Sequence, residues 1–119
     1  MSPQNAKIFH AEDDPEVRRL VEDLVRKQGH QVVLSADTLE AALARVPELA
    51  RLGINVVILD DKLRHFNDGL QIAQAIVNLH PDMPVISLST LATNYGIRHF
   101  DKQRLNKDKE GLVNFITRI

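Results

Sequence analysis

Residues 55–69 read NVVILDDKLRHFNDG. Residues 56–59 of this stretch form an unbroken and mostly β-branched apolar run, which is typical of a strand buried on both faces of a parallel sheet. The run ends in Asp60 and Asp61, and after a polar loop Asp68 opens an amphipathic helix. In open α/β sheets the groups that do chemistry lie just beyond the carboxyl ends of strands. The stretch alone leaves two interpretations open: a functional acid at a strand end, or a plain loop with Asp68 as a helix N-cap.

The bulk properties of the chain narrow the class of protein. With 119 residues, of which 44% are hydrophobic, we expect a single globular domain over residues 1–119. The net charge of −1 gives no basic field, which argues against direct binding of nucleic acid. The absence of cysteine excludes disulfides and thiolate metal sites. No apolar run approaches the roughly 20 residues that span a bilayer, and no signal-peptide pattern is present, so we expect a cytoplasmic protein without membrane insertion.

Strand patterns alternate with helix patterns along the chain. Strands are expected at residues 7–11, 31–34, 55–59, 85–88 and 97–100. Helices are expected at residues 15–28, 39–52 with an end or kink at Pro47, 68–79 and 106–118. This alternation implies a parallel sheet joined by right-handed crossovers. The predicted fold class is therefore α/β, a single-domain three-layer sandwich with helices on both faces of five strands.

Polar residues stand at the carboxyl ends of the inner strands. The first strand is followed by Glu12 and Asp13, the third by Asp60, the fourth by Ser89, and the fifth is followed closely by Lys102. Parallel strands end at the same edge of a sheet, so these groups are expected to converge. Carboxylates this close repel one another unless a cation joins them. Hard oxygen ligands without His or Cys favour Mg²⁺ over zinc.

This combination of groups suits the acceptance of a phosphoryl group. A carboxylate such as Asp60 attacks, while a metal ion and the ammonium of Lys102 stabilise the charge on the transferred group. Each residue also has a plain structural interpretation: Glu12 and Asp13 as helix N-terminal charges, Ser89 as a turn residue, and Lys102 as a solvated surface lysine.

The set resembles the receiver domain of two-component response regulators, which is CheY-like. The segments that carry the resemblance are IFHAEDDPEVRRLVEDLV (first strand, acidic pair and first helix), NVVILD with the following DG (phosphoacceptor strand and loop), MPVISLST (fourth strand with hydroxyl) and HFDK (fifth strand with lysine). The resemblance covers nearly the whole chain. It implies a flavodoxin-like sheet of order 2-1-3-4-5, a requirement for Mg²⁺, and a phosphoryl group received from a histidine kinase or a His phosphotransfer protein. The downstream protein partner stays open.

The resemblance also implies a role for each matching residue. These roles are metal binding for Glu12, Asp13, Asp60 and the backbone carbonyl of Lys62, phosphoacceptor for Asp60, switch hydroxyl for Ser89, and phosphate binding for Lys102. Asp61 competes as acceptor, because it has the family's usual spacing to Gly69. We favour Asp60 because it directly ends the apolar run. Thr90 competes with Ser89, which has the family's offset from Pro84.

The sequence departs from the family pattern between the fourth and fifth strands. Only 12 residues separate Ser89 from Lys102, and a helix of three turns alone takes roughly 11 residues. We therefore expect the fourth helix to be reduced or missing, which places family-style dimerisation in question. Gln103 follows the lysine where the family usually has proline, and His99 stands at the family's aromatic switch position. The other histidines, which show no ligand spacing, are interpreted as structural or solvated: His10, His30, His65 and His80.

Three functions compete on these grounds. The first is a receiver in phosphorelay signalling, which is not an enzyme but takes part in its own Mg²⁺-dependent phosphotransfer and dephosphorylation. The alternative is a pseudo-receiver, a protein-interaction module that works without phosphorylation. A Mg²⁺-dependent phosphohydrolase ranks last, because such enzymes commonly carry an acid two residues after the nucleophile and Lys62 stands there. A flavin site is disfavoured because the acidic residues after the first strand repel phosphate.

Overall fold

The computed structural model describes residues 5–60, 68–89 and 98–101; for residues 60, 89 and 98–101 the description is limited to the backbone. The helices and strands of these ranges are β1 (Lys7–Ala11), α1 (Pro15–Arg26), β2 (Gln31–Ala36), α2 (Leu39–Arg45), the 3₁₀ helix η1 (Val46–Glu48), β3 (Val56–Asp60), α3 (Asp68–Leu79), β4 (Val85–Ser89) and β5 (Arg98–Asp101). Among these helices, none combines the length and the apolar character that a membrane crossing requires.

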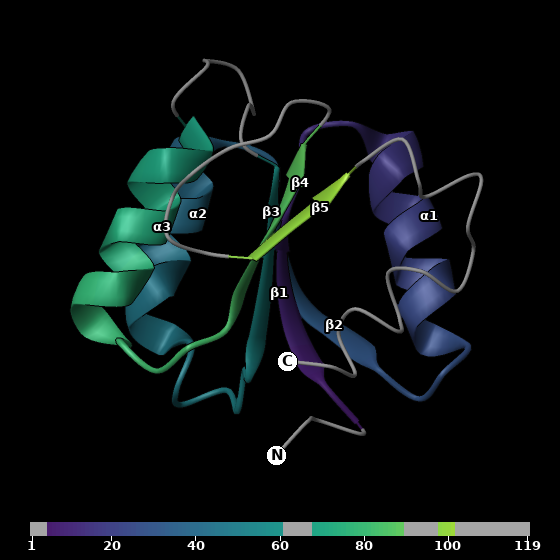
Figure 1. The fold of residues 1–119 in the computed structure, drawn as a ribbon, viewed down its shortest axis with the longest axis horizontal. Helices are drawn as coiled ribbons and strands as arrows, with labels where there is room; N and C mark the ends of the chain where they lie inside the picture. The colour runs from purple at the N-terminus through teal and green to yellow at the C-terminus, as the bar shows by residue number, and fades with distance from the viewer. Residues whose placement is uncertain (1–4, 61–67, 90–97, 102–119) are drawn as a thin grey trace.

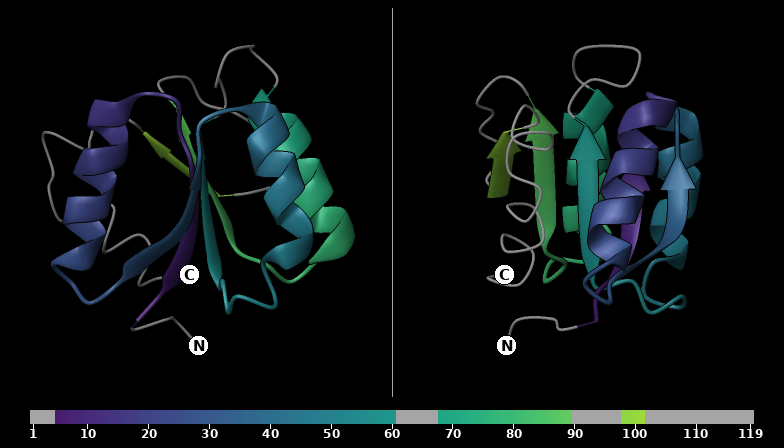
Figure 2. Two further views of the ribbon diagram at one scale, coloured as in Figure 1. Left: turned by 180° about the vertical axis from the view of Figure 1, so that it is seen from behind. Right: turned by 90° about the vertical axis from the view of Figure 1, so that its right-hand side faces the viewer.

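The five strands form one sheet in the order β2-β1-β3-β4-β5, and all neighbouring pairs are parallel. Helix α1 covers one face of the sheet, and α2 and α3 cover the other (Figure 1). The strands point the same way, as the side view in Figure 2 makes plain. All carboxyl ends therefore lie along one edge of the sheet, which we call the carboxyl edge, and the opposite edge is the amino edge. The expected fold class and strand order are confirmed.

Local sequence signals set the helix boundaries. Asp14 caps α1, since its Oδ1 accepts a hydrogen bond from the Glu16 amide at 2.9 Å, and Pro15 occupies the first turn, where its missing N–H costs nothing. Thr38 caps α2 through its Oγ1, which accepts from the Ala41 amide at 3.1 Å. Helix α2 ends at Arg45, and Pro47 lies in η1, as its lack of an amide donor predicts.

Two hydrophobic clusters hold the helices on the sheet. On one face, the buried residues of α1 pack against residues of β1, β3 and β4, among them Ile8, Ile58 and Ile86. On the other face, residues of α2, η1 and α3 pack against the alternate positions of the same strands, among them Phe9 and Leu59. Because β3 is covered on both faces, its run of four apolar residues shows none of the alternation of a half-exposed strand.

The boundaries differ from the expected ones in a few places. β2 runs two residues further than expected, to Ala36. β3 is shifted by one residue, because it begins at Val56, after Asn55, and includes Asp60, which pairs with Leu88 of β4. Helix α1 ends at Arg26 rather than directly before Gly29, and Gly29 adopts a positive φ of 87° in the turn that follows. The reduced fourth helix and the expected helix at 106–118 lie outside the described residues.

Candidate functional site at the carboxyl edge

The carboxyl ends of β1 and β3 are the centre of the candidate site. After β1 the chain turns to one neighbour, β2, and after β2 it passes back across β1 to β3, so the connections leave in opposite directions at this point. Such a switch point opens a crevice beyond the strand ends, where α/β proteins bind ligands. The register pairs Ala11 with Leu59, and the next residue of each strand is an acid, Glu12 and Asp60.

Glu12 and Asp13 differ sharply in their surroundings. Glu12 continues the ladder of β1, since its amide donates to the Ala36 carbonyl of β2 at 2.9 Å, and its side chain is 0% exposed. Its Oε2 accepts from the Asp14 amide at a long 3.4 Å. Asp13 is exposed to solvent. The pair therefore offers one carboxylate inside the protein and one at its surface, on consecutive residues of the same turn.

Ser89 belongs to the same edge of the sheet. Ser89 is the last residue of β4, and the register pairs it with Asp101, the last residue of β5. Lys102 follows Asp101 in the chain and lies, like Lys62, outside the described residues. The backbone thus brings together the strand ends that carry Glu12, Asp60 and Ser89.

Of the two candidate acceptors, Asp60 and Asp61, the structure places Asp60. Asp60 is the last residue of the strand, and its Cα partner is Leu88, one residue before Ser89. Asp61 lies outside the described residues. The choice of Asp60 as the acceptor rests on its place at the strand end and remains a prediction.

The donor set fits a hard cation such as Mg²⁺. Glu12, Asp13 and Asp60 supply carboxylate oxygens from two adjacent strand ends, and carboxylate oxygens are the protein ligands that Mg²⁺ prefers. A carboxylate as buried as Glu12 is costly unless donors or a cation surround it. Among the described side chains, which do not include that of Asp60, no three His, Cys, Asp or Glu residues form a ready metal cluster.

Asp68 is a further buried acid on this side of the molecule. It is the first residue of α3 and is 1% exposed, whereas one of the two interpretations that the sequence left open made it a helix N-cap. The amino end of a helix carries the positive end of the helix dipole, which favours a carboxylate. The burial of Asp68 had no signal in the sequence, because an acid at the start of a helix is ordinarily exposed.

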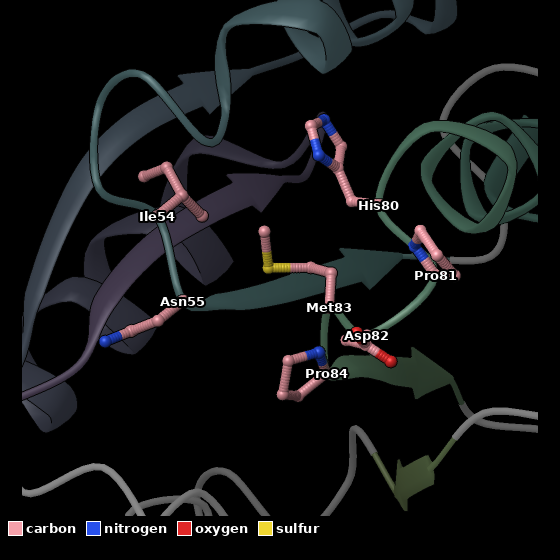
Figure 3. Close-up of a pocket in the computed structure, with 7 residues that line it drawn as sticks. All are labelled: Ile54, Asn55, His80, Pro81, Asp82, Met83 and Pro84. Carbon is pink, nitrogen blue, oxygen red and sulfur yellow. The ribbon is translucent and has the colours of Figure 1, made fainter.

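A separate hollow of about 330 Å³ lies at the amino edge, far from these acids in the fold. Ile54 and Asn55 line it from the start of β3, and the turn from His80 to Pro84 lines it from the other side (Figure 3). Figure 3 shows the Met83 side chain reaching from that turn toward Ile54. His80 Nε2 lies 2.8 Å from the Val46 carbonyl and donates to it, which ties the turn to η1. The hollow carries no cluster of acids.

The parallel sheet of this order, with acids at its switch point, defines a flavodoxin-like domain with a candidate phosphoryl site. A comparison with protein families matches the response regulator receiver domain over residues 8–105. The chain therefore belongs to the receiver domain family of response regulators, as its resemblance predicted. A comparison with curated proteins gives no match.

Solved structures of receiver domains share the fold. The receiver domain of the hybrid histidine kinase CckA is 25% identical, with a TM-score of 0.77 over 95% of this chain and 97% of that one. The response regulator domain of Thermotoga maritima CheB is 18% identical, with a TM-score of 0.76 over 94% and 93%. The receiver domain of Escherichia coli RcsB is 18% identical, with a TM-score of 0.74 over 96% and 94%.

Proposed function

We propose that this receiver domain works by phosphorylation: Asp60 accepts a phosphoryl group from the phosphohistidine of a histidine kinase or a His phosphotransfer protein. The observation that carries the proposal is the register of β1 and β3, in which Ala11 pairs with Leu59 and the acids Glu12 and Asp60 follow at the switch point. A strand end at such a crevice is accessible to a partner protein while the sheet holds its backbone fixed.

The residues of the chain have distinct parts in the proposed transfer. A carboxylate oxygen of Asp60 forms a bond to phosphorus as the bond from phosphorus to the donor nitrogen breaks, and the imidazole keeps that electron pair. Lys102 follows the end of β5 and is proposed to balance the charge of the phosphoryl oxygens. Ser89, at the end of β4, is proposed to donate a hydrogen bond to one of them.

Mg²⁺ is the cofactor that we propose for this transfer. Glu12, Asp13, Asp60 and the backbone carbonyl of Lys62 would hold the ion, which when bound neutralises charge on the phosphoryl oxygens. The buried position of Glu12 gives it a fixed place beside the strand end. The exposed position of Asp13 leaves its carboxylate free to reach a hydrated ion, and Mg²⁺ ordinarily keeps several water ligands.

We propose a phosphoacceptor rather than an enzyme with its own substrate. The phosphoryl group ends on the protein itself, and its later loss to water returns the starting carboxylate. The output then depends on the partner that binds the phosphorylated form. The proposal keeps the cytoplasmic location expected from the sequence, and cell fractionation tests that part of it.

Intact-mass spectrometry of the full chain after incubation with acetyl phosphate tests the proposal. With Mg²⁺ present we expect an adduct of one phosphoryl group, and with a chelator in its place we expect the unmodified mass. An unmodified mass in both samples, together with no heat of Mg²⁺ binding in a calorimetric titration, would support the pseudo-receiver instead.

A further inference from the structure

The amino end of β1 is held by side chains from both neighbouring segments of the sheet. The Ala6 amide donates to Nδ1 of His30 at 2.9 Å, and the Lys7 amide donates to Oδ1 of Asn55 at 2.8 Å. The carbonyls of the same two residues accept from the Gln31 and Asn55 amides, each at 2.9 Å. Two consecutive residues thus have both backbone groups satisfied, one through the β2 side and one through the β3 side.

The turn before β2 sets His30 in place. The His30 amide donates to the Val25 carbonyl at 3.0 Å, and Gly29 before it has a φ of 87°. This left-handed conformation favours glycine, and a Cβ on Gly29 would lie 3.1 Å from Oδ1 of Asn5. The ring that follows is 4% exposed and so meets the Ala6 amide in a place sheltered from water.

The direction of this hydrogen bond makes it sensitive to protonation. Nδ1 of His30 can accept the Ala6 N–H only while it carries no proton, because a protonated imidazole donates from both nitrogens. His80 differs, because its Nε2 donates to the Val46 carbonyl, a bond that the neutral and the protonated ring can both make. Of the two, only the His30 bond is broken by adding a proton.

The surroundings of His30 provide little to stabilise a charged ring. Burial lowers the pKa of His30 from its ordinary value. His30 lines a second hollow, different from the one in Figure 3. In the described part of the chain, α1 places two charged residues of opposite sign along it, Glu22 and Arg26. β2 adds the uncharged Gln31 to the same hollow. β1 presents the buried Ala6, and the neighbouring Lys7 is exposed.

We propose that His30 is a pH-sensitive fastener of the amino end of β1, which binds the Ala6 amide while the ring is neutral and releases that amide when the ring is protonated. Asn55 is the pH-independent counterpart, because its amide oxygen does not titrate in this range. Acidification therefore frees the Ala6 amide, while the bond between the Lys7 amide and Asn55 remains.

The sign of the pH dependence follows from the lowered pKa. The unfolded chain takes up a proton near the ordinary histidine value of 6.5, before the folded protein does. The contribution of the neutral ring to stability is therefore complete above that pH. It is lost as the pH falls from there through the lower pKa of the folded state.

Amide exchange of the full chain, followed by NMR between about pH 5 and about pH 8 and corrected for the intrinsic rate, tests the fastener. In the wild type, the protection of the Ala6 amide is expected to fall roughly tenfold from the upper to the lower pH, which corresponds to the loss of one hydrogen bond. In His30→Asn, the amide oxygen takes the place of Nδ1 without titrating, so protection is expected to stay constant. Equal falls in both proteins would overturn the proposal.

Two further measurements test the same proposal without the His30→Asn variant. Asn55→Ala removes the other side-chain acceptor, and it should lower the urea midpoint by the same amount at every pH in this range. The titration of the His30 ring in the wild type needs no variant. It should have its midpoint below 6.5 and coincide with the change at the Ala6 amide, and a midpoint at or above that value contradicts the fastener.

Discussion

At the carboxyl edge of the sheet, Glu12, Asp13 and Asp60 stand at the ends of adjacent strands, whereas at the amino edge His30, Asn55 and His80 each bind a backbone group within 2.9 Å. The amino-edge side chains satisfy N–H and C=O groups that would otherwise lack partners where strands and turns begin. Like charges gathered at one edge do not help the chain to fold. The difference indicates that polar groups serve stability at the amino edge, and it leaves the acids of the carboxyl edge for the phosphoryl transfer that we propose.

This comparison predicts that a mutation at one edge does not affect the properties of the other edge. The exception is a mutation in the strand that both edges share. Ile58 lies in the middle of β3 and is 0% exposed. Ile58→Ala should lower the free energy of unfolding by about 2–5 kcal/mol, because it leaves a cavity between the edges. Urea unfolding measures the loss. The control is Val77→Ala, at an α3 position that is 47% exposed, where we expect a change within about 0.5 kcal/mol. Similar losses in both variants would mean that β3 is not the shared support.

Mutation of His80 should lower stability by a smaller amount, through a contact that lies only at the amino edge. His80→Leu removes the donor to the Val46 carbonyl and should cost about 1 kcal/mol of unfolding free energy. His80→Gln keeps an N–H donor on a side chain of similar reach and should cost less. Neither change should alter phosphorylation by acetyl phosphate. A loss of phosphorylation in His80→Leu at a pH and temperature where it is fully folded would show that the edges are coupled.

Mutation of Asp13 should have the smallest effect on stability and should clearly weaken the binding of Mg²⁺. Since its side chain is exposed, Asp13→Asn should change the unfolding free energy by no more than about 0.5 kcal/mol. The affinity for Mg²⁺, measured by calorimetric titration, should fall by at least about tenfold. Glu16→Gln removes one negative charge from the nearby exposed first turn of α1 and is the matched control. Equal losses of Mg²⁺ affinity in the two variants would mean that Asp13 acts only through its negative charge and does not bind the ion.

The parts of the fold that the sequence predicted well are those with a strong local signal. Helix α3 begins and ends at the expected residues, because its apolar spacing is unbroken and Pro81 follows it. The end of α2 before Pro47 follows from one missing donor. The alternation of strands and helices predicted a parallel sheet, the family resemblance implied its strand order, and the sheet has that order.

The parts that the sequence could not predict depend on contacts between distant segments. Nothing local distinguishes Glu12, which is buried, from Asp13, which is exposed. His30 was interpreted as structural or solvated, and its bond to Ala6 joins residues 24 positions apart. Asn55, just before β3, bonds to Lys7 through both its amide and its side-chain oxygen, a use of the side chain that strand propensity does not encode. That the ends of β1, β3 and β4 meet at one edge was predictable, because parallel topology alone brings those ends together.

The central claim is that Asp60, at the end of β3, receives the phosphoryl group. The most direct measurement is the intact mass of Asp60→Asn and Asp61→Asn, each incubated with acetyl phosphate and Mg²⁺ beside the wild type. We expect the phosphoryl adduct to disappear in Asp60→Asn and to persist in Asp61→Asn, since Asp60 directly ends the apolar run of β3. An adduct that persists in Asp60→Asn and disappears in Asp61→Asn would contradict the claim and make Asp61 the acceptor.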